Sequence, residues 1–184
     1  MGELRFVVRR NSMNKRIVSV FGLAMLMLLL LVLPALASPP AHVEGTLAYA
    51  GAPENLEWRT VGKNCIIDVD VPYIFDGDLQ GLAKTHFRVV SHGKCSDLPM
   101  PFEYDENLKA FGTFDGSVDG KNGTFDFVLM AKGWSVKPGD LALVGKIVIL
   151  SGTNDLANLH GVLELSYLMD DPSDTYTGQI HFDP

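Results

Sequence analysis

The sequence predicts an all-β fold: a single antiparallel sheet of roughly eight strands closed into a barrel, with a β-sandwich as the alternative. Three observations lead to it. Apolar runs of 6 to 12 residues alternate with clusters of Gly, Asp, Asn and Pro. No long segment after residue 37 has helical periodicity. Several runs alternate apolar and polar residues one by one, which is typical of antiparallel strands with one face in water.

The pattern places each strand between turn-forming residues. The stretch DGKNG at 119–123 predicts a tight turn, since Gly and Asn tolerate positive φ. A sheet of this size without covering helices must close or fold over to protect its edges. We expect strands at about 42–49, 56–62, 64–71, 79–90, 108–118, 122–132, 141–150, 160–169 and 175–182. A loop is the alternative for one of the first two of these segments.

The run ILSGTNDLANLHGVLEL, residues 149–165, interrupts two apolar strands with small polar residues. We interpret it as a corner of the barrel. Gly152 takes a backbone conformation that other residues resist. Thr153 or Asn154 caps a single helical turn at Asp155–Asn158. Two leucines then plug this end of the barrel: Leu156 and Leu159.

The first 37 residues have the pattern of a signal peptide. Lys15 and Arg16 precede an apolar run at 17–33, and Ala35–Ala37 offers a small-residue cleavage site. Met13 is an alternative start, and an uncleaved membrane anchor is the alternative function of the segment. Either way the domain is predicted to lie outside the cytoplasmic membrane, secreted or in the cell envelope. We divide the rest into an irregular N-terminal segment at 38–55 and a barrel domain at 56–184.

Composition limits the partners. Residues 38–184 hold 10 Lys and Arg against 21 Asp and Glu, a formal charge of −11. Such a surface repels phosphate backbones and anionic lipids, so we expect no nucleic acid partner and no membrane contact unless the leader is uncleaved. The cysteines, Cys65 and Cys95, both lie in the exported part, where an even pair favours a disulfide over a metal site or a nucleophile.

The corner sequence SGTNDLANLHG resembles a glycine-rich signature of an uncharacterised family of allene oxide cyclase-like β-barrels. The stretches FDGDLQG, GTFDGSVDGKNGTFDFVLMAKG and YTGQIHF follow in the same order, so the resemblance covers roughly residues 56–183. Dirigent proteins resemble it more distantly. Asn154 departs from the usual glycine of the signature, although Asn also accepts left-handed geometry. The resemblance implies the barrel, with a binding cavity as its commonest use, and carries over no catalytic residues.

The apolar face of the strands is the predicted interior. If it encloses a cavity rather than a filled core, we expect the ligand to be an apolar small molecule. Binding inside the barrel requires a void of at least about 300 Å³. Eight-stranded barrels are also about the size that side chains fill alone. The predicted ligand-binding residues are Phe87, Phe125, Phe127, Leu129, Leu163, Tyr167 and Phe182.

Acid–base groups fall on the other face. Glu164, Asp126, His86 and His181 share the solvent-facing parity, which argues against an enzyme. Loops at the barrel mouth remain an alternative source of catalytic groups, at Asp76, Asp78 or His160. The catalytic residues are therefore unassigned. His181 and Asp183 stand two apart without an identifiable third ligand, so we predict no metal site and no cofactor.

Two adjacent strands also carry apolar residues on their outer parity: Val128, Met130, Val144, Val148 and Leu150. Apolar residues on both faces indicate that something covers the outside. The segment around Leu56 and Trp58 is one such cover, and a second subunit of a homo-oligomer is the other. The leading functional hypothesis is a non-enzymatic, exported barrel that binds an apolar small molecule or serves an interaction in the cell envelope. A cyclase or isomerase and a purely structural module are the alternatives.

Overall fold

The structure is a computed structural model that describes residues 39–97, 105–135, 141–168 and 174–183. The chain forms two compact units, residues 1–36 and 37–184. The first unit, and with it the predicted leader, lies outside the described residues. In the described part, no helix has the length and apolar character needed to cross a membrane.

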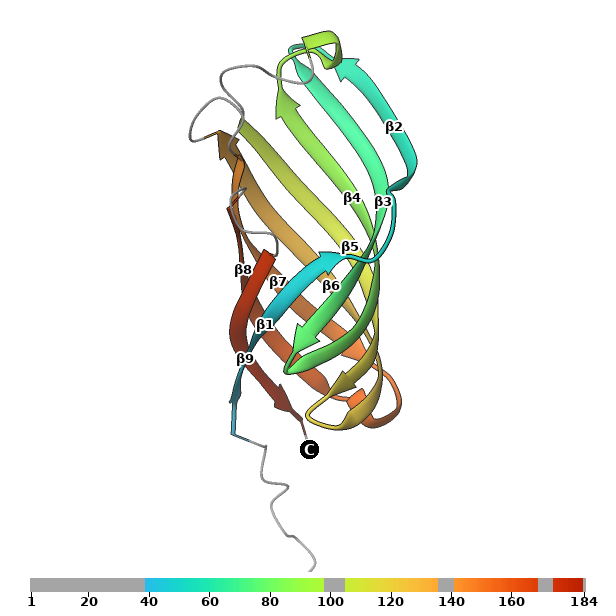
Figure 1. Cartoon of the computed structure of the whole chain (residues 1–184), viewed down its shortest axis with the longest axis vertical. Helices are drawn as coiled ribbons and strands as arrows, with labels where there is room; N and C mark the ends of the chain where they lie inside the picture. The colour runs from blue at the N-terminus through green and yellow to red at the C-terminus, as the bar shows by residue number, and fades with distance from the viewer. Residues whose placement is uncertain (1–38, 98–104, 136–140, 169–173, 184) are drawn as a thin grey trace, which may run out of the picture. The chain divides into compact units, whose positions relative to one another are not determined.

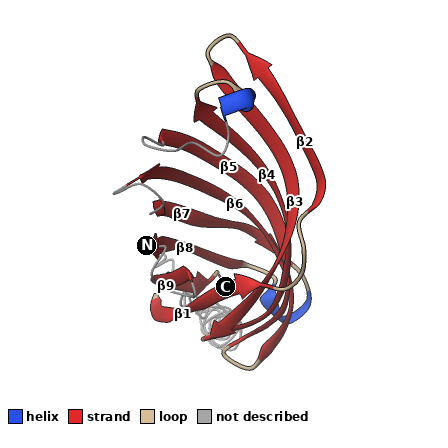
Figure 2. Ribbon diagram, turned by 45° about the horizontal axis from the view of Figure 1, so that its top comes forward, coloured by secondary structure: helices blue, strands red, loops and turns tan. Residues whose placement is uncertain are grey.

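The described residues of the second unit form nine strands and two short 3-10 helices (Figure 2). All neighbouring strands are antiparallel. The elements are β1 (Ala41–Tyr49), β2 (Glu54–Val61), β3 (Asn64–Gly77), β4 (Leu79–His92), η1 (Cys95–Asp97), β5 (Asp105–Val118), β6 (Lys121–Ser135), β7 (Leu141–Gly152), η2 (Asn154–Leu156), β8 (Leu159–Leu168) and β9 (Asp174–Phe182).

The strands make one sheet in the order β1-β9-β8-β7-β6-β5-β4-β3-β2, and β1 also pairs with β3. This last pairing closes a ring of eight strands, which is nearly a barrel and consists of β1 and the seven strands from β3 through β9 (Figure 1). The ninth strand, β2, pairs with β3 and is not part of the ring. The predicted all-β antiparallel fold is therefore confirmed. The barrel begins at β1, inside the segment 38–55 that we expected to be irregular, because Val43 and Leu47 alternate inward and are buried.

One strand, β3, has two partners on the same edge. Its first half pairs with β2, and its second half, from Tyr73 to Gly77, pairs with β1. Pro72 lies at the change of partner, and its carbonyl accepts a hydrogen bond from the Ala50 N–H at 2.9 Å. Because the N–H and C=O of a strand residue point to the same side, the N–H that proline lacks would point to this junction. The strand thus runs through Pro72 to Gly77, beyond the predicted end at residue 71.

The two ends of the barrel differ. The closed end carries the turns β3–β4 and β5–β6 and the helix η2, and the open end is the opposite one, where β5 begins and β6 ends. At the closed end aromatic rings fill the interior: Phe114 and Phe125 stack with ring centroids 4.5 Å apart, and Phe75 meets Phe114 edge-on at 5.5 Å. The hydroxyl of Tyr176 accepts a hydrogen bond from the buried Leu79 N–H at 2.9 Å.

The corner at η2 closes this end as expected, with Leu156 and Leu159 fully buried. Two details differ from the prediction. Thr153 precedes η2 without a side-chain cap, and its hydroxyl instead lies 2.7 Å from the hydroxyl of Thr124 on β6. Gly152 is needed for close approach rather than for its φ, since a Cβ there would collide with the carbonyl oxygen of Leu156.

Side-chain bonds hold β2 and the open end. The Asp68 carboxylate on β3 is 2.7 Å from Arg88 Nε on β4 and 2.9 Å from Arg59 Nη1 on β2. The hydrogen bonds from Arg88 and Arg59 lower the pKa of Asp68 below its ordinary value. The predicted disulfide is present: Cys65 at the start of β3 is bonded to Cys95 in η1. Covalent and ionic ties therefore replace core packing at this end.

Candidate functional site: a cavity at the open end

A cavity of about 220 Å³ lies inside the open half of the barrel. Its wall is mainly apolar, with two carboxyl groups and three phenols among the apolar side chains. Tyr49 is part of this wall and is 69% exposed, so the cavity reaches the surface at that residue. The lining residues are Leu47, Tyr49, Val69, Val71, Tyr73, Phe75, Phe87, Val89, Glu106, Leu108, Phe127, Leu129, Leu143, Ile147, Leu165, Tyr167 and Asp174.

The more deeply buried of the two carboxyl groups belongs to Glu106, near the start of β5, and the other belongs to Asp174. Strand pairing places Glu106 between Ser91 of β4 and Gly133 of β6 on the inward face. A Cβ at Gly133 would lie 2.8 Å from Glu106 Oε1, so the glycine leaves the space that the carboxyl group occupies. Glu106 is 4% exposed, and burial raises its pKa to about 7. The carboxyl group can therefore give or take a proton at neutral pH.

Three phenols line the cavity from the other strands of the ring. Tyr49 of β1 and Tyr73 of β3 are register partners whose rings stack at 5.2 Å, and Tyr167 comes from β8. Burial, followed by the charge and hydrogen bond of Tyr49, raises the pKa of Tyr73. Burial likewise raises the pKa of Tyr167. The phenols of Tyr73 and Tyr167 thus keep their protons at neutral pH and can donate hydrogen bonds.

The structure divides the seven predicted ligand-binding residues between the two halves of the barrel. Four line the cavity: Phe87, Phe127, Leu129 and Tyr167. Phe125 and Leu163 are fully buried in the core at the closed end. Phe182 is half-buried at that end, with Lys121 Nζ 3.6 Å from the centre of its ring. Ligand binding by these side chains stays a prediction.

Sequence reasoning missed Glu106 because it began the strand at residue 108. Extending the alternation of Leu108 and Ala110 back by two residues would have placed Glu106 inside. The sequence analysis also predicted a single inward phenol, Tyr167. In the structure Tyr49 and Tyr73 line the cavity as well, from the segments where β1 and β3 pair. The three loop positions weighed as catalytic, Asp76, Asp78 and His160, do not line this cavity.

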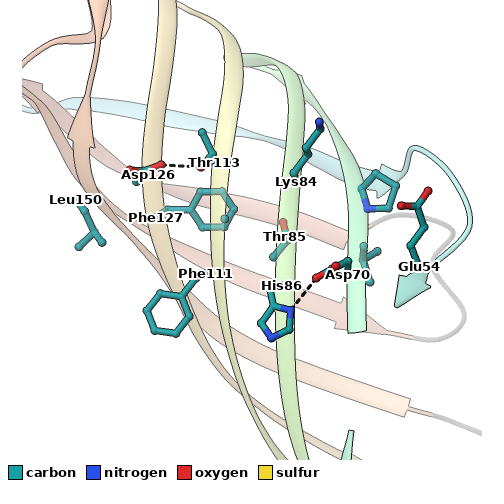
Figure 3. A pocket seen from close by; sticks show the side chains of 13 residues that line it. Glu54, Asp70, Lys84, Thr85, His86, Phe111, Thr113, Asp126, Phe127 and Leu150 are labelled. Atoms are coloured by element: carbon teal, nitrogen blue, oxygen red, sulfur yellow. Dashed lines mark hydrogen bonds and ion pairs between the residues drawn. The ribbon is translucent and has the colours of Figure 1, made fainter. Parts of the chain in front are cut away.

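A second hollow of about 730 Å³ lies against β3 to β6, beside Glu54 (Figure 3). Two of its carboxylates, Asp70 and Asp126, accept hydrogen bonds from neighbouring side chains. His86 Nδ1 is 2.7 Å from Asp70 Oδ1, and the Asn55 amide donates to Asp70 Oδ2 at 2.7 Å. The Thr113 hydroxyl donates to Asp126 at 2.7 Å. Because the inner cavity is lined mainly by buried apolar side chains, it is the better candidate for small-molecule binding.

Two histidines at the closed end lie beside the same carboxylate. His160 Nε2 and His181 Nε2 lie 3.3 and 3.4 Å from the two carboxylate oxygens of Asp183. The sequence therefore missed His160 as a neighbour of the other two. Among the residues that the structure describes, no three His, Cys, Asp or Glu side chains are grouped as a metal site would require.

Comparison with known proteins places the chain in a family. The model of a protein family of unknown function, DUF3224, matches residues 43–177. The chain belongs to the DUF3224 family. A crystal structure of a DUF3224 protein of unknown function from Shewanella oneidensis MR-1 is similar, with a TM-score of 0.60 and 16% sequence identity. The match covers 79% of this chain and all of that one, and it supports the fold alone.

A search of the curated proteins finds no match. The uncharacterised family expected from the sequence is thus identified as DUF3224, whereas the likeness to allene oxide cyclases and dirigent proteins stays a prediction. Family membership assigns no activity, so any function must come from the site itself.

Proposed function

We propose that this DUF3224 protein binds a small, mainly apolar molecule with one polar group in the open-end cavity. The observation that carries the proposal is the composition of the cavity wall: apolar side chains surround a buried carboxyl group and phenols. Sites for small molecules typically combine such a lining with a few polar groups that orient the ligand.

The volume limits the ligand. At about 220 Å³ the cavity is smaller than the void of at least about 300 Å³ that we expected binding inside the barrel to require, so it does not enclose a whole drug-sized ligand. An apolar cavity of roughly 150 Å³ nevertheless binds benzene. The ligand is therefore a single ring or a short chain, or the end of a longer molecule whose remainder passes the exposed Tyr49.

The polar groups specify the other part of the ligand. Glu106 has a pKa near neutrality, so it can donate a hydrogen bond when protonated and accept one when ionised. The phenols of Tyr73 and Tyr167 are held protonated and supply donors. A ligand hydroxyl or carbonyl group meets a partner in this cavity, whereas a permanently charged group would have to be desolvated at a cost.

Titration with phenol and with benzene, followed by amide chemical shifts, tests this proposal. We expect both to bind in fast exchange and phenol to bind more tightly. Leu143→Trp, which fills the cavity from β7, should abolish binding of both. Leu82→Trp, on the exposed outer face of β4, is the matched control and should keep it. Equal binding by the two tryptophan variants would contradict the proposal.

A second candidate function is proton transfer by a cyclase or isomerase, and Glu106 is the observation that favours it. An inward carboxyl group with a pKa near 7 suits a general base that removes a proton next to a carbonyl group. A phenol donor would stabilise the oxygen of the resulting enol, and the carboxyl group would return the proton. This reading agrees with the predicted resemblance to allene oxide cyclases.

Deuterium exchange into cyclohexanone separates the two functions. A base at Glu106 should accelerate exchange at the carbons next to the carbonyl group, with a rate that rises through pH 7 and is lost in Glu106→Gln. Binding of cyclohexanone without accelerated exchange would leave a binding protein and refute the isomerase.

We also propose that the protein acts outside the cytoplasmic membrane. The disulfide between Cys65 and Cys95 supports this location because such bonds persist in oxidising compartments. Fractionation of host cells, with blotting of the mature form, should find a protein shortened by about the length of a signal peptide outside the cytoplasm. A full-length cytoplasmic protein would contradict the proposal.

A further inference from the structure

The outer surface of the barrel carries an apolar face that the proposed function does not use. Its residues come from the four neighbouring strands β5 to β8, and five of them, all except Val128 and Val148, are 45 to 54% exposed. Single exposed apolar residues are ordinary, but a contiguous patch marks an interaction surface. The outer apolar face consists of Phe111, Val128, Met130, Val144, Val148, Leu150 and Val162.

The strand register puts the middle of this face in one straight row. Phe111 pairs with Val128, Val128 with Val148, and Val148 with Val162. At about 4.8 Å between strands, the row is about 14 Å long. Figure 3 shows Phe111 and Leu150 extending from the strands beside Asp126. The row is therefore an apolar strip that crosses the outside of four strands of the ring.

The rows on the two sides of this apolar row differ in charge. Toward the open end the next row is Lys109, Met130, Lys146 and Glu164, which are also consecutive register partners. Toward the closed end, two residues from Phe111 and Val128, lie Thr113 and Asp126, and His160 precedes Val162 by two. One side thus has two lysines around a methionine, and the other has an aspartate at the position that corresponds to the methionine.

We propose that the outer apolar face binds a second copy of this chain, forming a homodimer with its two-fold axis along the row Phe111–Val162. A rotation about this axis brings the closed-end side of one copy over the open-end side of the other. Asp126 of the second copy then lies opposite Met130, between Lys109 and Lys146. In the same way Glu164 of one copy faces His160 of the other. Under this rotation the apolar row lies against itself, and the charges on one side of the row meet opposite charges on the other. A two-fold interface requires such self-complementarity.

The lysines are available for this contact. Lys146 Nζ is 3.6 Å from Glu164 and Lys109 Nζ is 4.8 Å from the centre of the Phe111 ring, and both side chains are on the exposed surface. A long lysine side chain can reach a new carboxylate while its stem stays on apolar surface. Asp126 keeps its bond to Thr113, which leaves its second oxygen to the lysines.

Charge reversal tests the dimer on the full chain by sedimentation velocity. We expect the wild type to sediment at twice the monomer mass. Asp126→Lys places cations opposite Lys109 and Lys146, and the double variant Lys109→Asp, Lys146→Asp places carboxylates opposite Asp126. Each variant alone should be monomeric, because dimer association is weakened by roughly tenfold or more. All three changes are on the surface, and unchanged near-ultraviolet circular dichroism will confirm folding.

The decisive sample is the mixture of the two variants. When they pair with each other, both sets of contacts again join opposite charges, so the mixture should form a heterodimer. Asp155→Lys, an exposed carboxylate in η2, is the matched control and should stay dimeric. A monomeric wild type overturns the proposal, and so does a dimer that survives the charge reversals or a mixture that stays monomeric.

Discussion

The closed and open ends of the barrel are built from the same alternation and reach different results. At the closed end Phe75, Phe114, Phe125 and Tyr176 fill the space between the strands. At the open end β3 pairs with β2 rather than with β1, so the ring is not completed there, and a cavity remains. The comparison teaches that stability and ligand binding are separated along one barrel axis. Aromatic packing stabilises the closed end. At the open end a disulfide and ion pairs stabilise the strands, and a buried carboxyl group lies in the cavity.

The largest effect is expected from removing an aromatic ring at each end. Phe114 is fully buried, so Phe114→Ala should lower the free energy of unfolding by about 3–5 kcal/mol. Phe87 faces the cavity, where part of its surface has no packing partner, so Phe87→Ala should cost clearly less. Urea unfolding with the disulfide intact measures both. Equal losses would mean that the two ends are packed alike.

The next effect concerns the covalent tie at the open end. Replacing both cysteines, Cys65→Ser with Cys95→Ser, should lower the free energy of unfolding by about 3–4 kcal/mol, because the bond closes a loop with a sequence separation of 30. Hydrogen exchange should show that protection is lost first in β2 and the start of β3. If protection were lost first at the closed end, the assignment of the disulfide to open-end stability would be wrong.

Glu106 should give the open end its own pH dependence. Its folded-state pKa of about 7 lies above the unfolded value of 4.5, so its contribution to stability is full below pH 4.5 and is lost as the pH rises through 7. The total change is about 3 kcal/mol at most, at 1.36 kcal/mol per pKa unit. Unfolding by urea between pH 4 and 9 should show this decline in the wild type. A decline of the same size in Glu106→Gln would remove Glu106 as its cause.

The smallest effect is expected at the ionic tie of β2. The pKa of Asp68 is lowered by Arg88 and Arg59, so its contribution to stability is present above the ordinary pKa and is lost as the pH falls through the folded value. Asp68→Asn should be less stable than the wild type at pH 7 and approach its stability as the pH falls below the ordinary pKa of an aspartate. Asp115→Asn, which removes an exposed carboxylate on β5, is the control for lost charge. Its stability relative to the wild type should not change in this way with pH. A constant difference at all pH values would argue against the ion pairs.

Most of the fold could be predicted from the sequence because alternation and turn residues act locally. Every strand was placed near its position, and the corner at η2 was identified with its two buried leucines. Pairing across the sheet was harder. The partner change at Pro72 depends on the distant β1 and β2, which no local pattern records.

The candidate site was less predictable for a physical reason. Alternation tells which side chains face inward, but not whether they fill the space between the strands. Phe125 and Phe127 have the same parity, yet only Phe127 lines the cavity. Glu106 was missed because the predicted strand began two residues after it, so Glu106 was not counted as an inward position. The omission matters because an inward carboxyl group makes proton transfer a candidate function.

A crystal of the protein exposed to xenon tests the existence of an apolar binding site at the open end most directly. Xenon enters dry apolar cavities and is readily located. The account predicts a xenon atom among Phe87, Leu129 and Leu165, and none between the stacked rings of the closed end. Side chains that fill the open half, or xenon at the closed end alone, would contradict it.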